Sequence, residues 1–71
     1  MRIAEMNDIA ESYHLELHQE QGWHLIAVDD SESLVLDIHV FAPSRYNVEQ
    51  FHQVCRLAQQ LFYPEGSKYF D

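Results

Sequence analysis

Residues 13–41 constrain the fold most, because apolar and polar residues alternate there in three runs that are separated by two turn-like breaks. Alternation with a period of two is typical of strands that bury one face. The first and third runs each place apolar side chains on one face: Tyr13, Leu15 and Leu17 in the first, and Leu34, Leu36, Ile38 and Val40 in the third. We therefore expect a three-stranded antiparallel meander with these residues in its core.

The middle run, residues 23–28, is apolar on both faces, so the register of the first hairpin decides which face joins the core. A slip of one residue exchanges the two faces. We expect a two-residue turn at residues 21–22, which pairs Leu17 with Ile26. Ile26 and Val28 then join the core. That register leaves five apolar side chains on the far face of the sheet: Trp23, Leu25, Ala27, Val35 and Phe41.

A short amphipathic helix is expected before the meander. Its apolar residues recur at spacings of three and four: Ile3, Met6, Ile9 and Ala10. A helix this short is marginal alone and must dock on another element. The far face of the sheet and the rim of the core are both open to it. An edge strand over residues 2–6 is the alternative.

A second helix is expected after the meander. Asn47 stands at the predicted N-cap, and Gln50 follows in the capping-box position. The helix carries one broad apolar stripe: Val48, Phe51, Val54, Cys55, Ala58, Leu61 and Phe62. We expect this stripe to pack across the core face of the meander. Pro64 ends the helix, and residues 68–71 form a tail with two aromatic side chains.

Length, composition and charge predict one small α+β domain over residues 1–71. A hydrophobic fraction of 46% is enough for a folded core. The chain has 12 acidic residues against 4 Lys or Arg, which gives a formal net charge of -8. Such a charge opposes phosphate backbones and anionic membranes, and it favours basic partner proteins. We expect binding neither to nucleic acid nor to a membrane.

The cysteine content and the absence of long apolar runs favour a cytoplasmic protein. Cys55 is the only cysteine, which excludes an internal disulfide and fits a reducing compartment. No run of about 18 apolar residues and no basic-then-apolar leader occurs.

The five histidines are candidate metal ligands, but their spacing does not favour a metal site. His14 and His18 would lie roughly 13 Å apart on a strand, too far to share an ion. Asp37 and His39 share a face but lack an evident third ligand. Cys55 falls in an apolar stripe, where a thiol is usually inert. Without a nucleophile elbow or a phosphate-binding glycine loop, we expect no metal, no cofactor and no catalysis.

Two binding hypotheses remain. In the first, an acidic side of the domain binds the basic surface of a nucleic-acid-handling protein, because carboxylates pair with arginine in the geometry that phosphates use. The carboxylates expected to do so come from the strands and turns: Glu16, Glu20, Asp29, Asp30, Glu32 and Asp37. In size and charge, such an inhibitor is analogous to acidic proteins of phages and mobile elements, including anti-CRISPR proteins that mimic nucleic acid.

The second hypothesis is a homodimeric adaptor or accessory protein that binds through the far sheet face. Trp23 would be the aromatic anchor there, since aromatic side chains at partly apolar surfaces are common binding anchors. If the N-terminal helix covers that face, the face has only a packing role.

Overall fold

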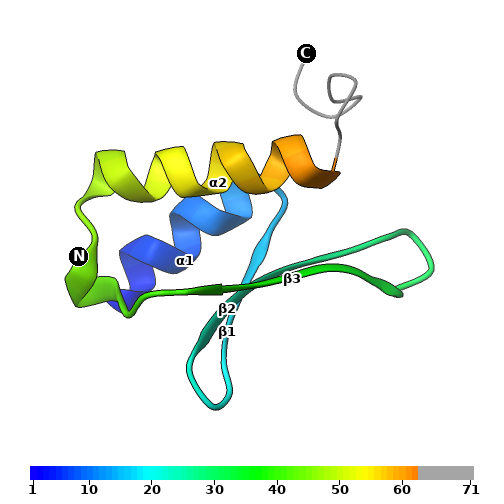
Figure 1. Ribbon diagram of the computed structural model, residues 1–71, viewed down its shortest axis with the longest axis horizontal. Coiled ribbons are helices and arrows are strands. Elements are labelled where there is room, and N and C mark those ends of the chain that lie inside the picture. The colour runs from blue at the N-terminus through cyan, green and yellow to red at the C-terminus, as the bar shows by residue number, and fades with distance from the viewer. Residues whose placement is uncertain (63–71) are drawn as a thin grey trace.

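The computed structural model describes residues 1–62, which form one antiparallel sheet with both α-helices on the same side of it (Figure 1). The elements follow in chain order: α1 (Ile3–Ser12), β1 (Glu16–Gln19), β2 (Trp23–Val28), β3 (Leu34–Val40), the short 3-10 helix η1 (Pro43–Arg45) and α2 (Val48–Phe62). The predicted α+β class, the meander and both helices are confirmed. The predicted helix stop at Pro64 and the aromatic tail at residues 68–71 lie outside the described residues.

The first hairpin has a three-residue loop, not the predicted two-residue turn. Leu17 stands opposite Leu25, and Gln19 stands opposite Trp23. The loop between them is closed by the Glu20 N–H, which donates to the Gly22 carbonyl at 2.8 Å. Gly22 has a φ of 115°, which a side chain at that position would oppose, and this supports the longer loop. The predicted register is therefore wrong by one residue.

The one-residue difference in register exchanges the two faces of β2 relative to the prediction. Leu25 and Ala27 are 0% and 1% exposed because they lie beneath the helices, whereas Val28 is 38% exposed. The alternation along β2 places Trp23, which is half-buried, on the helix side with them, and Ile26 on the opposite side. The expected apolar far face around Trp23 therefore does not form.

A bulge shifts the register of the second hairpin. Ala27 pairs with Leu36, but Val28 pairs with Leu34, so one residue of β3 has no partner between them. The bulge turns Leu34 away from the core and leaves it 56% exposed. The prediction of a core position is wrong for Leu34. For the remaining apolar residues of that face the prediction is confirmed, since they pack against the core: Leu36, Ile38 and Val40.

The first strand begins later than the alternation predicts. The chain turns at Tyr13 and His14 after α1, and His14 has a φ of 60°. Tyr13 nevertheless packs against the core, and its hydroxyl shares a 2.7 Å hydrogen bond with Nδ1 of His52. The side-chain amide of Gln59 donates to the Tyr13 carbonyl at 3.1 Å. These two contacts fix the end of α1 against α2.

Both helices contribute to one core on the same face of the sheet. From α1, Met6, Ile9 and Ala10 are buried, whereas Ile3 at its start is exposed. This confirms the N-terminal helix and excludes the edge strand at residues 2–6. Because α1 lies on the core side, it does not cover the other face of the sheet.

The predicted start and core face of α2 are confirmed. Asn47 and Gln50 form a reciprocal capping box, with hydrogen bonds of 2.8 and 2.9 Å between each backbone N–H and the side-chain oxygen of the other residue. Phe51, Cys55 and Ala58 are fully buried, so the centre of the stripe packs as expected. The stripe is narrower than predicted at its ends, because Val48 and Leu61 are exposed.

Candidate interaction surface

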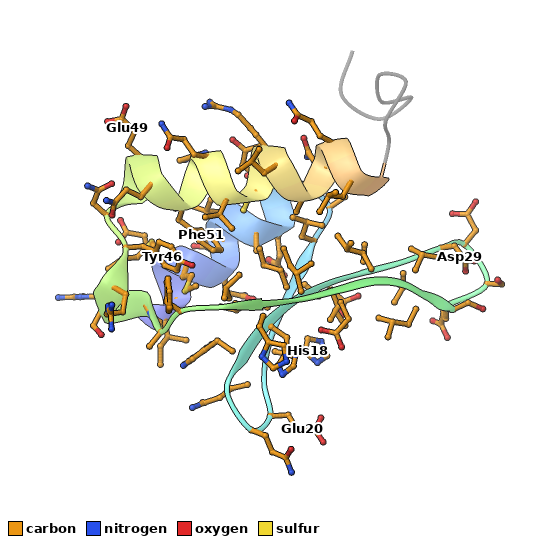
Figure 2. The ribbon with its side chains drawn as sticks, viewed as in Figure 1. His18, Glu20, Asp29, Tyr46, Glu49 and Phe51 are labelled. Carbon is orange, nitrogen blue, oxygen red and sulfur yellow. The ribbon has the colours of Figure 1, made fainter. Side chains whose placement is uncertain are left out.

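One face of the sheet is left uncovered by the helices of residues 1–62, and we call it the open face. Two cross-strand rows define it. The first row contains His18, His24 and His39, from β1, β2 and β3 respectively, and we call it the histidine row. The second row contains Glu16, Ile26 and Asp37 in the same strand order. Figure 2 shows His18 on the side of the sheet away from both helices.

The imidazoles of the histidine row lie beside carboxylates and beside each other. The ring centroids of His24 and His39 are 4.1 Å apart. Nε2 of His18 lies 3.2 Å from a carboxylate oxygen of Glu16. The histidine row is therefore part of a mixed cluster, in which three neighbouring imidazoles lie beside carboxylates of the second row.

His24 has a hydrogen-bond partner at each of its two ring nitrogens. Its Nδ1 lies 2.8 Å from Oδ1 of Asp37, and its Nε2 lies 3.0 Å from the carbonyl oxygen of Glu20. A neutral imidazole has one N–H and can donate to only one of these acceptors, whereas the imidazolium donates to both. Chiefly through the hydrogen bond with Asp37, this geometry raises the pKa of His24 above 6.5.

The open face is hollowed at this cluster, with a volume of about 410 Å³. The histidine row lines the hollow together with Glu20 and Asp37, while Ile26 and Leu34 supply an apolar part. The hollow is open to solvent. Its shape and chemistry suit a cationic side chain, whose methylenes could contact the apolar residues while its charge meets the carboxylates.

Charge is distributed unevenly over the molecule. Residues 16–40, which form the sheet and its two loops, contain six carboxylates and no Lys or Arg. Among residues 1–62, the Lys and Arg side chains are Arg2, Arg45 and Arg56, which precede α1, end η1 and lie on α2. Arg45 also stacks over the ring of Phe41, at 5.0 Å from its centroid. The negative charge of the sheet is therefore not balanced on the sheet itself.

The β2–β3 loop forms a second acidic surface, at the end of β2 away from Glu20 (Figure 2). Oδ1 of Asp29 accepts hydrogen bonds from the N–H groups of Ser33 and Ser31, both at 2.9 Å, and from the Ser31 hydroxyl at 2.8 Å. These bonds, chiefly the one from the Ser33 N–H, lower the pKa of Asp29 below 3.8. Asp29 thus organises the loop, while Asp30 and Glu32 are exposed beside it.

The predicted partner-binding residues therefore divide into three groups. Glu16 and Asp37 lie in one row of the open face, and Glu20 lines the hollow in that face. The acidic loop residues stand at the other end of β2, and Trp23 lies on the opposite side of the sheet. The histidine row was missed, because in the predicted register His24 would face the core and could not join His18 and His39. A prediction of a three-residue loop in the first hairpin would have placed His24 opposite His18 and on the same face.

Cys55 is buried, and its burial raises the pKa of the thiol to about 12, so it is not a thiolate near neutral pH. Among residues 1–62, no group of three or more His, Cys, Asp or Glu side chains is placed to hold a metal ion. In the same part of the chain, no helix has the length and apolar character needed to cross a membrane.

Comparison of the chain with known protein families, curated proteins and solved structures found no match.

Proposed function

We propose that this protein is a binding module that uses the open face to dock on a basic surface of a nucleic-acid-handling protein, and so inhibits or regulates it. One observation supports this most: Glu20 and Asp37 line one hollow, and Glu16 lies in the same cross-strand row as Asp37, on a sheet that carries no Lys or Arg. The proposed mode of action is that of a nucleic-acid mimic, as in anti-CRISPR-like inhibitors. The module acts by occupying a surface and carries out no reaction.

The physical basis is the match between carboxylates and guanidinium groups. A carboxylate can accept two parallel hydrogen bonds from one arginine, which is also how arginine binds phosphate. Neighbouring strands lie about 4.8 Å apart, so a sheet face holds such groups at fixed spacings. Because the strands fix the backbone of Glu16 and Asp37, binding there costs less conformational entropy than binding to carboxylates on a flexible loop.

The β2–β3 loop contributes to the same function through its electrostatic field. Asp30 and Glu32 lie at the far end of β2 and add to the negative field of the sheet. Fields of this kind raise the rate of association with a cationic partner, and salt screens them. We therefore assign direct contact to the open face and electrostatic steering to the loop.

The experiment compares two variants with the same change of charge. The face variant is Glu16→Gln/Glu20→Gln/Asp37→Asn, and the helix control is Glu5→Gln/Asp8→Asn/Glu11→Gln on α1, where all three side chains are exposed. Affinity capture from the native host supplies a candidate partner, which is then purified, and its dissociation constant is measured for each form. Since an exposed ion pair contributes about 0.2–1 kcal/mol, loss of three such pairs should weaken partner binding by the face variant by roughly 3- to 150-fold.

The helix control separates specific docking from general charge attraction. We expect it to bind nearly as well as the wild type, and we expect wild-type binding to weaken as salt rises. Equal losses in the two variants, or unchanged binding of the face variant, would show that the open face is not the docking surface.

The alternative, an adaptor or homodimer that uses an apolar surface, requires residues other than those around Trp23. Phe41 and Leu57 are exposed and flank a groove lined in part by Tyr46 and Val54. Side chains of this kind can anchor a partner. In the same experiment, partner binding that survives the face variant but is lost on Phe41→Ser would favour this alternative.

A further inference from the structure

We propose that the histidine row makes binding at the open face dependent on pH, so that the basic partner is held at neutral or alkaline pH and released as the medium becomes acidic. This inference rests on the proposed function and adds a mode of regulation to the same surface. Imidazoles change their charge between about pH 5 and 8, whereas the arginines of a partner keep theirs.

The open face has as many imidazoles as carboxylates. Three carboxylates and three imidazoles belong to it: Glu16 and His18 from β1, Glu20 from the first loop, His24 from β2, and Asp37 and His39 from β3. With neutral imidazoles the face carries a charge of about −3, and full protonation of the row cancels it. No Lys or Arg of residues 16–40 alters this balance. The helices pack on the other side of the sheet, so their charged groups do not face the row.

Protonation of His24 also pairs the Asp37 carboxylate with a cation of the protein itself. The imidazolium of His24 donates to Asp37 at 2.8 Å and to the Glu20 carbonyl at 3.0 Å, so both of its N–H groups are satisfied on the face. A partner arginine would then have to displace a charged hydrogen bond in order to reach Asp37. His18 stands in a similar position beside Glu16. At acidic pH, imidazolium groups of the protein therefore occupy the carboxylates that the partner's cations bind at neutral pH.

The switch does not require the fold to open. The folded-state pKa of His24 is raised, so its bond with Asp37 stabilises the fold fully at pH below 6.5. That contribution is lost as pH rises through the raised value. Over the range in which the imidazoles gain protons, the face changes its charge while this contact becomes stronger. Release of the partner would thus come from charge compensation and not from unfolding.

The test uses a synthetic arginine-rich peptide as the probe, because its charge is constant over the range. The dissociation constant is measured at about pH 5.5 and about pH 8, where most surface carboxylates stay ionised. We expect binding by the wild type to be about tenfold or more weaker at the lower pH. The variant His18→Gln/His24→Gln/His39→Gln should bind equally at both values. The control His14→Asn, outside the row, should keep the pH dependence.

The outcomes separate this inference from the proposed function. Wild-type binding that is specific to the open face but equal at both pH values overturns the switch and leaves the docking function intact. A pH dependence that persists in the triple variant overturns the switch as well. No binding of the wild type at either pH counts against the docking function and the switch together. If the triple variant does not fold, His18→Gln/His39→Gln keeps the His24 contacts and should lose most of the pH dependence.

Discussion

At the residue scale, neighbouring acidic side chains have different tasks. Asp37 and Glu20 hold His24 through a carboxylate and a backbone carbonyl, and they also line the hollow. Asp29 is turned inward on its own loop, where its Oδ1 accepts three hydrogen bonds. Asp30 is exposed beside it. Sequence alone treats these acidic residues as equivalent, because it shows their charge but not the donors that surround each of them.

Replacement of Asp29 by alanine should loosen the β2–β3 loop. The N–H groups of Ser31 and Ser33 would lose their acceptor, so we expect both to exchange with solvent faster in hydrogen-exchange measurements. Asp30→Ala is the control and should leave both rates unchanged. The pKa of Asp29 is lowered, so its contribution to stability is present above pH 3.8 and is lost as pH falls through the lowered value. Equal exchange rates in the two variants would contradict this role.

At the scale of elements, the sequence predicted which segments form strands and helices but not how two of the strands pair. The strand at residues 34–40 and the capping box at Asn47 were predicted from local signals, and both are confirmed. The register depends on the conformation of the loop at Gly22 and on which side chains fit beneath the helices. The bulge beside Val28 is likewise set by tertiary packing. The histidine row could not be predicted before these features were known.

Truncation of two apolar residues of β2 tests the observed register. Leu25 is fully buried, so Leu25→Ala should lower the free energy of unfolding by about 2–5 kcal/mol. Val28 is 38% exposed, and Val28→Ala should cost less than about 1 kcal/mol. Denaturant unfolding measures both. A larger loss for Val28→Ala than for Leu25→Ala would favour the register that places Val28 in the core.

At the scale of the whole molecule, the two sides of the sheet have separate roles. The apolar side packs against α1 and α2 and supplies the core, and the open face presents carboxylates and imidazoles. The described Lys and Arg residues lie outside the sheet. A small domain can thus present charged groups on one face of its sheet, because the core needs only the other side.

The most direct test of the open face as the binding surface is a map of backbone amide NMR shifts while the arginine-rich peptide is added at about pH 8, where imidazoles are mostly neutral. We expect the largest changes at His18, Glu20 and His39, with α1 residues such as Asp8 nearly unaffected. Changes concentrated on α1 or α2, with the open face unchanged, would contradict this assignment.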